Sequence, residues 1–174
     1  MDIVSHGLWG GIAFGRKSKR DWWTSFAFGV APDALSFGIL FVLTFLGFAA
    51  RPDWASGPPD PSFIPQYVHA LYNITHSFVT FGAVFGIVWL LLKRPFLPML
   101  AWAFHITLDI FTHDIEFFPT PYLWPFPFTP VDGASWAHPA IWYPNVALLA
   151  ALYLAWYLVR RRRARRRSGG TLKT

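Results

Sequence analysis

The sequence predicts an all-α integral membrane protein built as a four-helix bundle. Of its 174 residues, 54% are hydrophobic, 20% are aromatic and only 14% are charged, whereas about a quarter of the residues in a typical soluble domain are charged. A helix needs roughly 20 apolar residues to cross a bilayer. Stretches of that length occur at residues 22–50, 67–92, 96–118 and 140–159. The chain is therefore expected to form one transmembrane domain over residues 1–159.

Three basic clusters predict the topology of this bundle. They are RKSKR at 16–20, the pair Lys93 and Arg94, and the arginine-rich run at 160–167. Cytoplasmic loops of membrane proteins carry an excess of Lys and Arg. Placing all three clusters inside gives a multi-pass protein of the cell's inner membrane with both termini cytoplasmic. Residues 160–174 then form a basic cytoplasmic tail that contacts lipid headgroups, and nucleic-acid binding is not expected.

The first segment, MDIVSHGLWGGIAFG, is too short to span a bilayer. It is predicted to be a short helix that is either re-entrant, packed against the bundle, or interfacial, lying on the membrane. Gly7, Gly11 and Gly15 recur every four residues and would form a smooth stripe that lets another helix approach closely. Gly82 and Gly86 offer a similar surface in the second spanning stretch.

Two loops, at 51–66 and 119–139, are so rich in proline that regular helix is excluded over much of their length. The second loop is also strongly aromatic. It is expected either to fold back as a lid over the bundle or to form an aromatic belt at the membrane interface, and both interpretations stay open.

Ionisable residues lie deep within three of the apolar stretches. Asp33 falls roughly 16 Å into the first predicted helix, His76 about 15 Å into the second, and His105 with Asp109 roughly 14–20 Å into the third, at 1.5 Å per residue. The four side chains could therefore meet near the bilayer midplane. His105 and Asp109 are four residues apart, so both project from one helix face as a natural metal clip.

A metal site is the predicted reason for these costly positions, because buried ionisable groups in a membrane need a partner or an ion. The chain contains no cysteine, so the ligands must be nitrogen and oxygen atoms. The expected ligands of a divalent ion, with zinc as the expected metal, are His6, Asp33, His76, His105 and Asp109. The residues expected to surround them are His69, Thr75, Ser77 and His113. Asp114 is expected at the outer rim.

Several short motifs resemble a known family. SHGLWG near the start, APD in the first stretch, YNITHS in the second, and HITLDIFTH followed by FPTPYLWPF occur in that order over most of residues 1–130. They resemble the prokaryotic family of membrane-bound, metal-dependent hydrolases, whose histidines and aspartates map onto the same five predicted ligands. Some relatives carry a histidine and an arginine where this chain has Leu71 and Tyr72. The family's distant similarity to zinc-dependent phospholipase C implies phosphoester chemistry by analogy.

The expected function is a membrane-embedded, metal-dependent hydrolase that cleaves an ester or phosphoester of a lipid or other small amphiphile, with Asp33 and Asp109 as the catalytic carboxylates. Five protein ligands exceed one tetrahedral site, so either two ions bind or one carboxylate is a general base. Two alternatives stay open. One is a small transporter or proton relay that uses the buried histidines and aspartates. The other is a b-type haem protein with axial histidines from facing helices.

Overall fold

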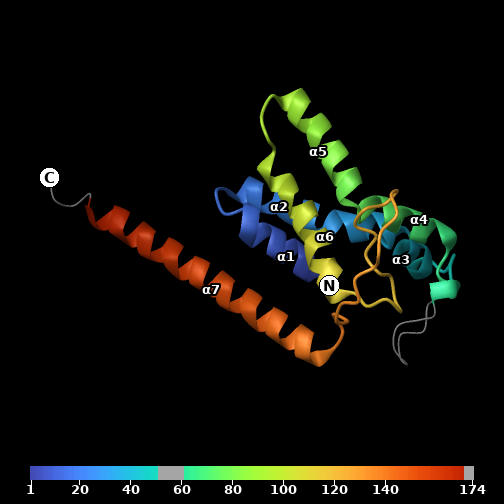
Figure 1. Ribbon diagram of the computed structural model, residues 1–174. Coiled ribbons are helices and arrows are strands. Elements are labelled where there is room, and N and C mark those ends of the chain that lie inside the picture. The colour runs from blue at the N-terminus through green and yellow to red at the C-terminus, as the bar shows by residue number, and fades with distance from the viewer. Residues whose placement is uncertain (51–60, 171–174) are drawn as a thin grey trace.

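The computed structural model describes residues 1–50 and 61–170, and these residues contain helices, turns and loops but no strand (Figure 1). The predicted all-α class is therefore confirmed. The helices are α1 (Ile3–Phe14), α2 (Lys19–Ser36), α3 (Gly38–Phe45), α4 (Gln66–Thr75), α5 (Phe78–Leu92), α6 (Leu100–Thr112) and α7 (Pro139–Gly170), with short 3₁₀ turns η1 (Pro61–Phe63) and η2 (Leu97–Met99). Most of the first predicted loop, residues 51–60, lies outside the described residues.

The predicted spanning helices differ in length and continuity from the observed ones. Among the described residues, one helix segment, Pro139–Arg166 of α7, is by itself long and apolar enough to cross a membrane. The stretches at 22–50 and 67–92 are not continuous helices: α2 meets α3 at 64°, and α4 meets α5 at 58°. By length and composition the count of spans rises to at most three if each bent pair is one span. The four-span topology stays a prediction.

The bend after α2 has a local cause. Pro32 lies inside the helix and supplies no backbone N–H, while the Ser36 hydroxyl donates to the Pro32 carbonyl at 2.9 Å. Such back-bonding from a serine to the carbonyl four residues earlier bends helices. The helix ends there, and α3 leaves in a new direction.

The break between α4 and α5 is a helix cap inside an apolar run. Ser77 has an extended backbone, and its hydroxyl oxygen accepts from the amides of Val79 and Thr80. The same hydroxyl donates to the Trp124 carbonyl, and the Phe78 amide donates to the Tyr122 carbonyl at 2.9 Å. The backbone groups freed by the break are thus paired with the 119–139 loop.

Replacing Ser77 by alanine is expected to lower the free energy of unfolding by about 1 kcal/mol, because the first amides of α5 lose their cap. Denaturant unfolding of the protein in detergent micelles, followed by circular dichroism, measures this change. Ser135→Ala, in the loop after α6, is the control and should leave the unfolding free energy near the wild-type value. Equal stability of the two variants would contradict the assigned cap.

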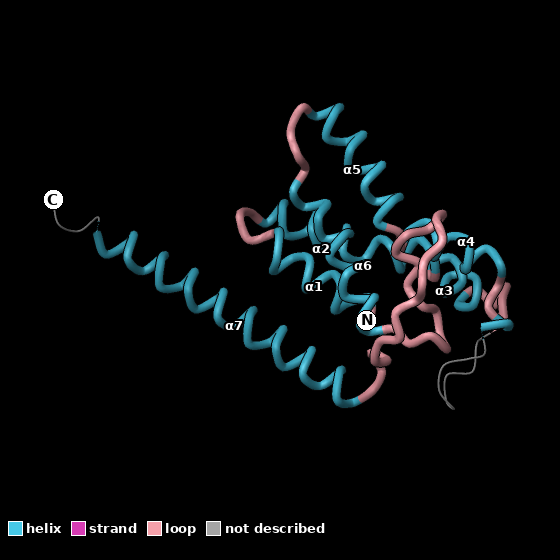
Figure 2. The backbone as a smooth tube through the Cα atoms, in the orientation of Figure 1, coloured by secondary structure: helices cyan, strands magenta, loops and turns pink. Residues whose placement is uncertain are grey.

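The N-terminal helix α1 packs into the molecule against α2 and α6, and α7 joins it from the other side (Figure 2). The predicted glycine stripe is confirmed: a Cβ at Gly7 would lie 2.6 Å from Phe26, and one at Gly11 would lie 2.6 Å from Trp22. Gly82 and Gly86 do not form such a contact, since a Cβ there would meet no atom within 4 Å. Close approach of helices at small residues is therefore a feature of α1 alone among these stripes.

Polar side chains tie α7 to α1. The Trp9 indole donates to Asn145 Oδ1 at 2.8 Å, the Asn145 amide donates to the Ser5 hydroxyl at 2.8 Å, and the Tyr153 hydroxyl donates to the Leu8 carbonyl at 2.8 Å. These hydrogen bonds fix the position of α7 along α1.

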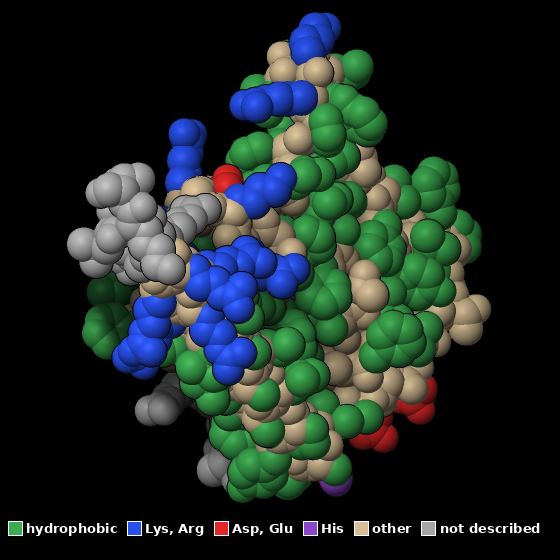
Figure 3. Space-filling model, turned by 90° about the vertical axis from the view of Figure 1, so that its left-hand side faces the viewer, with side chains coloured by type: hydrophobic (Ala, Val, Ile, Leu, Met, Phe, Trp, Pro, Cys, Tyr) green, Lys and Arg blue, Asp and Glu red, His purple; other side chains and the backbone are tan. Residues whose placement is uncertain are grey.

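Basic side chains gather where α7 ends. The arginine-rich segment that was predicted as a tail continues α7 as helix. Arg160 and Arg163 line the same hollow as Arg16 and Lys17 from the turn between α1 and α2. Figure 3 shows the resulting concentration of Lys and Arg on this face. Two of the three predicted basic clusters therefore lie together.

The loop that follows α6 is hydrogen-bonded to the end of that helix, and the lid and the aromatic belt both stay predictions for it. Amides of Gly133, Ala134 and Trp136 donate to the carbonyls of the last α6 residues and of His113. A small apolar core lies beside the loop, where α3, α4 and the loop meet; it contains Leu40, Ile64, Val68, Tyr72 and Phe118. The interior between α1, α2 and α6, in contrast, holds several buried polar side chains, namely Ser5, His6, Ser25, Asp33, His105 and Asp109.

Candidate metal centre

Four buried ionisable side chains meet between α2, α6 and the α4–α5 break. Asp33 comes from α2, one residue after Pro32, and His76 ends α4 at the break. His105 and Asp109 lie one turn apart on α6 and face inward, as their spacing predicts. Each of the four offers a ligand atom, and these atoms all lie within 4.8 Å of one another.

The separations of these atoms match those of a tetrahedral site. His105 Nε2 lies 3.0 Å from both His76 Nε2 and Asp109 Oδ2. His76 Nε2 lies 3.4 Å from Asp33 Oδ1 and 3.5 Å from Asp109 Oδ2, and His105 Nε2 lies 3.8 Å from Asp33 Oδ1. Four ligands around zinc at 2.0–2.1 Å stand about 3.3 Å apart. The described side chains therefore enclose a space of the right size for such an ion.

Hydrogen bonds to the other ring nitrogens orient both histidines. His105 Nδ1 donates to the Gly29 carbonyl at 2.7 Å, and His76 Nδ1 donates to the Tyr72 carbonyl at 3.1 Å. With an N–H group used there, the neutral form of each ring presents a lone pair at Nε2, directed at the other ring and at the carboxylates. Acceptors in such close contact repel unless a cation or a proton lies between them.

His6 lies on the far side of Asp109, outside the group of four. Its Nε2 is 2.9 Å from Asp109 Oδ1, the oxygen that points away from His76, and its ring stacks on His105 with centroids 3.6 Å apart. The Met1 amino nitrogen lies 2.5 Å from the same oxygen. All ion pairs recorded for Asp33 and Asp109 within the described ranges are with histidines or with this amino group.

Of the residues predicted to surround the ligands, some contact the group of four directly and others lie further away. His113 Nε2 is 3.4 Å from Asp109 Oδ1, and the Thr75 hydroxyl is 3.0 Å from His76 Nδ1. Ser77 supports the site indirectly by capping α5. His69 stacks on Phe118, with centroids 4.7 Å apart, and is not part of the group of four. Asp114 accepts amide hydrogens at the end of α6.

Two supporting residues were missed from the sequence. Gly29 provides the carbonyl for His105, and a Cβ on it would lie 2.5 Å from the His6 carbonyl oxygen. Its position four residues before Asp33, inside a helix where glycine is unfavourable, is a signal that could have revealed it. Tyr72 stacks on His76 with centroids 3.8 Å apart, and its hydroxyl donates to the Phe118 carbonyl at 3.0 Å.

The geometry disfavours the haem alternative for His76 and His105. Axial nitrogens on opposite faces of a metal stand about 4 Å apart, which is twice a metal–nitrogen bond of roughly 2 Å. The two Nε2 atoms are 3.0 Å apart, and the carboxylates of Asp33 and Asp109 surround them. No porphyrin plane fits between these rings.

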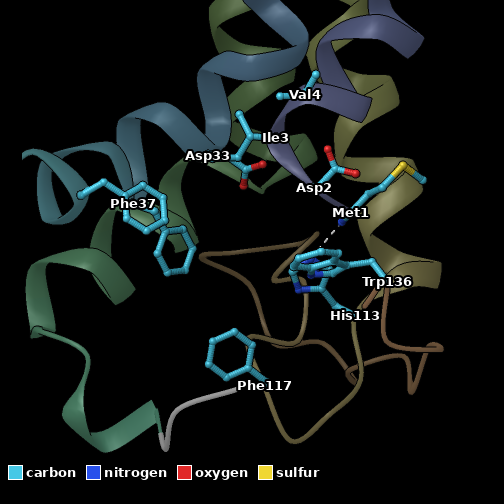
Figure 4. Close-up of a pocket in the computed structure, with 10 residues that line it drawn as sticks. Met1, Asp2, Ile3, Val4, Asp33, Phe37, His113, Phe117 and Trp136 are labelled. Atoms are coloured by element: carbon cyan, nitrogen blue, oxygen red, sulfur yellow. Dashed lines mark hydrogen bonds between the residues drawn. The ribbon is translucent and has the colours of Figure 1, made fainter. Parts of the chain in front are cut away.

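A pocket of about 370 Å³ leads to the cluster (Figure 4). Asp33 and His113 belong both to its lining and to the cluster or its immediate surroundings. Aromatic side chains form much of the remaining wall, namely Phe37, Phe41, Phe117 and Trp136. A molecule in this pocket would therefore reach the polar cluster through Asp33 and His113.

Comparison with known proteins leaves the site to be interpreted from its own geometry. No family model, no curated protein and no solved structure matches the chain.

Proposed function

We propose that the protein is a membrane-embedded, metal-dependent hydrolase whose ion lies between Asp33, His76, His105 and Asp109. The observation that carries this proposal is the facing pair of imidazoles. Their Nε2 atoms are 3.0 Å apart while both Nδ1 atoms are held by backbone carbonyls. A divalent cation between these nitrogens and the two carboxylates would bind all of them as ligands, and zinc accepts imidazole and carboxylate ligands.

The four residues divide into ligands and a base. Catalytic zinc sites use three protein ligands and leave the fourth position for water or substrate. His76, His105 and Asp109 are fully buried and are the proposed ligands. Asp33 borders the pocket, and its Oδ2 has no hydrogen-bond partner among the described residues. It is the proposed general base, placed to orient a water molecule and accept its proton.

A bound divalent ion would supply Lewis acidity, which activates water near neutral pH and polarises the oxygen of the group under attack. The chain's own residues supply the geometry. Gly29 and Tyr72 hold the imidazoles through their carbonyls, as carbonyls and carboxylates around metal-bound histidines commonly do.

Placement in the inner membrane, with the basic ends of α1 and α7 on the cytoplasmic side, is part of the proposal; the predicted cytoplasmic N-terminus is not, because the Met1 amino group lies against Asp109 in the cluster. Helix α5 has no buried residue, and Leu90, Leu91 and Leu154 are strongly exposed. Exposed apolar surface on this scale is typical of contact with lipid or with a partner. The clustering of Arg16, Lys17 and the α7 arginines supports a common cytoplasmic side.

Metal analysis tests the proposal directly. Protein purified in detergent, loaded with zinc and freed of excess metal by gel filtration is expected to hold stoichiometric zinc, and His105→Ala is expected to hold none. His69→Ala is the matched control, since His69 lies outside the group, and it should retain the wild-type zinc content. Zinc that is absent from the wild type, or unaffected by His105→Ala, would refute the proposed site.

A further inference from the structure

The pocket beside the cluster is mostly apolar, with a few polar side chains in its lining. Phe37, Phe41, Phe117 and Trp136 line it together with Asp33 and His113, and Figure 4 shows Asp33, Asp2 and His113 on the side of Met1, away from Phe37. Its volume of about 370 Å³ falls at the lower end of the roughly 300–1,000 Å³ of small-molecule sites. A ligand with a single hydrocarbon chain and a polar group at its end would match this combination of apolar walls and a few polar side chains.

The charges around the pocket limit the kind of polar group that can be cleaved. None of the described residues that line it is Lys or Arg. Asp2 also borders the pocket, but its two oxygens already accept from the Ser5 amide and hydroxyl at 2.9 and 2.6 Å. The two positive charges of one divalent ion only neutralise the negative charges of Asp33 and Asp109. The positive charge of the Met1 amino group, which lies against Asp109, then neutralises the remaining negative charge, that of Asp2. No positive charge remains for a phosphate group, which brings one negative charge as a diester and nearly two as a monoester.

Proteins that bind phosphate normally supply Arg, Lys or free helix N-terminal amides. Here the N-terminus of α1 is already capped by Asp2, and carboxylates face the space where the phosphate would lie. An extra negative charge among these carboxylates and aromatic rings would be unfavourable, because it would be poorly solvated and repelled. An uncharged carbonyl carries no such penalty, and it acquires only one negative charge when it is attacked.

We propose that the pocket holds the hydrocarbon chain of a lipid whose scissile group is an uncharged carboxylic ester, presented to the cluster between Asp33 and His113. This inference rests on the proposed hydrolase function and selects esters over the phosphoesters that the family resemblance implies. In the reaction the oxygen of water bonds to the acyl carbon, and the bond between that carbon and the alcohol oxygen breaks. The water's proton passes through Asp33 to the alcohol, so the products are a fatty acid and an alcohol.

The test uses non-cleavable ligands and does not depend on turnover. The protein is loaded with cobalt(II) in lipid nanodiscs, and its visible absorption is titrated with octanohydroxamic acid, octylphosphonic acid and acetohydroxamic acid. The first two probes have alkyl tails of nearly equal length. Each affinity is expressed relative to that probe's affinity for free cobalt(II), which removes the difference in intrinsic chelation and leaves the difference in headgroup charge. The hydroxamate is expected to perturb the cobalt spectrum at a concentration about ten-fold or more lower than the phosphonate, because its headgroup brings less negative charge to the carboxylates.

Two matched variants test whether the hydrocarbon tail of the ligand lies in this pocket. Val4→Trp narrows the pocket, since Val4 borders it, whereas Val84→Trp lies on α5, outside its lining. Val4→Trp is expected to weaken the binding of octanohydroxamic acid about ten-fold or more, because the indole obstructs the space for the alkyl tail, and to leave the binding of acetohydroxamic acid unchanged. Val84→Trp should match the wild type with both ligands.

The outcomes separate this inference from the proposed function. If cobalt does not bind at all, the hydrolase proposal fails, and this inference fails with it. If cobalt binds but octylphosphonic acid binds as tightly as the hydroxamate, the preference for uncharged esters is overturned. If Val4→Trp weakens the binding of both hydroxamates equally, or of neither, the hydrocarbon tail of the ligand does not occupy this pocket.

Discussion

Asp33→Asn is expected to keep its metal and to lose hydrolysis. The amide preserves the shape of the side chain but cannot accept a proton, and the three proposed ligands, His76, His105 and Asp109, remain in place. Loss of a general base lowers turnover by roughly 10²- to 10⁴-fold. The measurement is kcat for a chromogenic ester such as p-nitrophenyl octanoate, made together with the zinc content of the same sample.

Asp114→Asn is the matched control for this substitution, because it makes the same chemical change at the end of α6 outside the cluster. Its side chain accepts the amides of Glu116 and Phe117, which an amide oxygen can also do, so activity and zinc content should be those of the wild type. If Asp33→Asn hydrolyses the ester at the wild-type rate, Asp33 is not the base. If it loses its zinc, Asp33 is a ligand and the division of roles is wrong.

Gly29→Ala is expected to reduce both stability and metal affinity, although no ligand is altered. The added Cβ would lie 2.5 Å from the His6 carbonyl oxygen, so α1 and α2 must separate. Overpacking of this kind costs about 1–3 kcal/mol of unfolding free energy. The shift also moves the Gly29 carbonyl that orients His105, and changes in such supporting groups typically weaken metal binding about 10- to 100-fold.

Gly86→Ala tests whether this effect is specific, since a Cβ at Gly86 meets no atom within 4 Å. In a helix interior alanine is favoured over glycine by up to about 1 kcal/mol, so this variant should be as stable as the wild type or slightly more so. Denaturant unfolding and competition with a zinc chelator measure the two quantities. A Gly29→Ala protein that matches Gly86→Ala in both would show that the close crossing of α1 and α2 does not control the site.

Helical content and the approximate position of most helices could be predicted from apolar runs, because burial in lipid and burial in protein both require them. The bends could not be predicted by this approach, since a hydropathy window averages over a cap. Ser77 lies inside the predicted spanning stretch 67–92, yet it begins a new helix. A serine whose hydroxyl caps the amides two and three residues further on is a local signal that overrides the average. Ser36 is a second local signal of this kind, because its hydroxyl donates to the Pro32 carbonyl at the bend between α2 and α3.

Helical periodicity predicted that His105 and Asp109 share one face, and depth along each stretch predicted that Asp33 and His76 approach them. The structure brings these four together. The position of His6 depended on how α1 crosses α2, which is set by contacts between helices that no local pattern contains. Spacing and depth together therefore identified the four residues that meet, but they also included His6 among the ligands and did not show which oxygen of Asp109 each histidine contacts.

The two carboxylates of the cluster come from helices far apart along the chain, Asp33 on α2 and Asp109 on α6, and this separation has a kinetic consequence. Contacts between distant segments form late in folding, after the entropy of closing the intervening chain has been lost. An ion that requires all of these side chains would then stabilise the native state more than the transition state for folding. Zinc would therefore slow unfolding while leaving the folding rate nearly unchanged, and would lengthen the lifetime of the protein in the membrane.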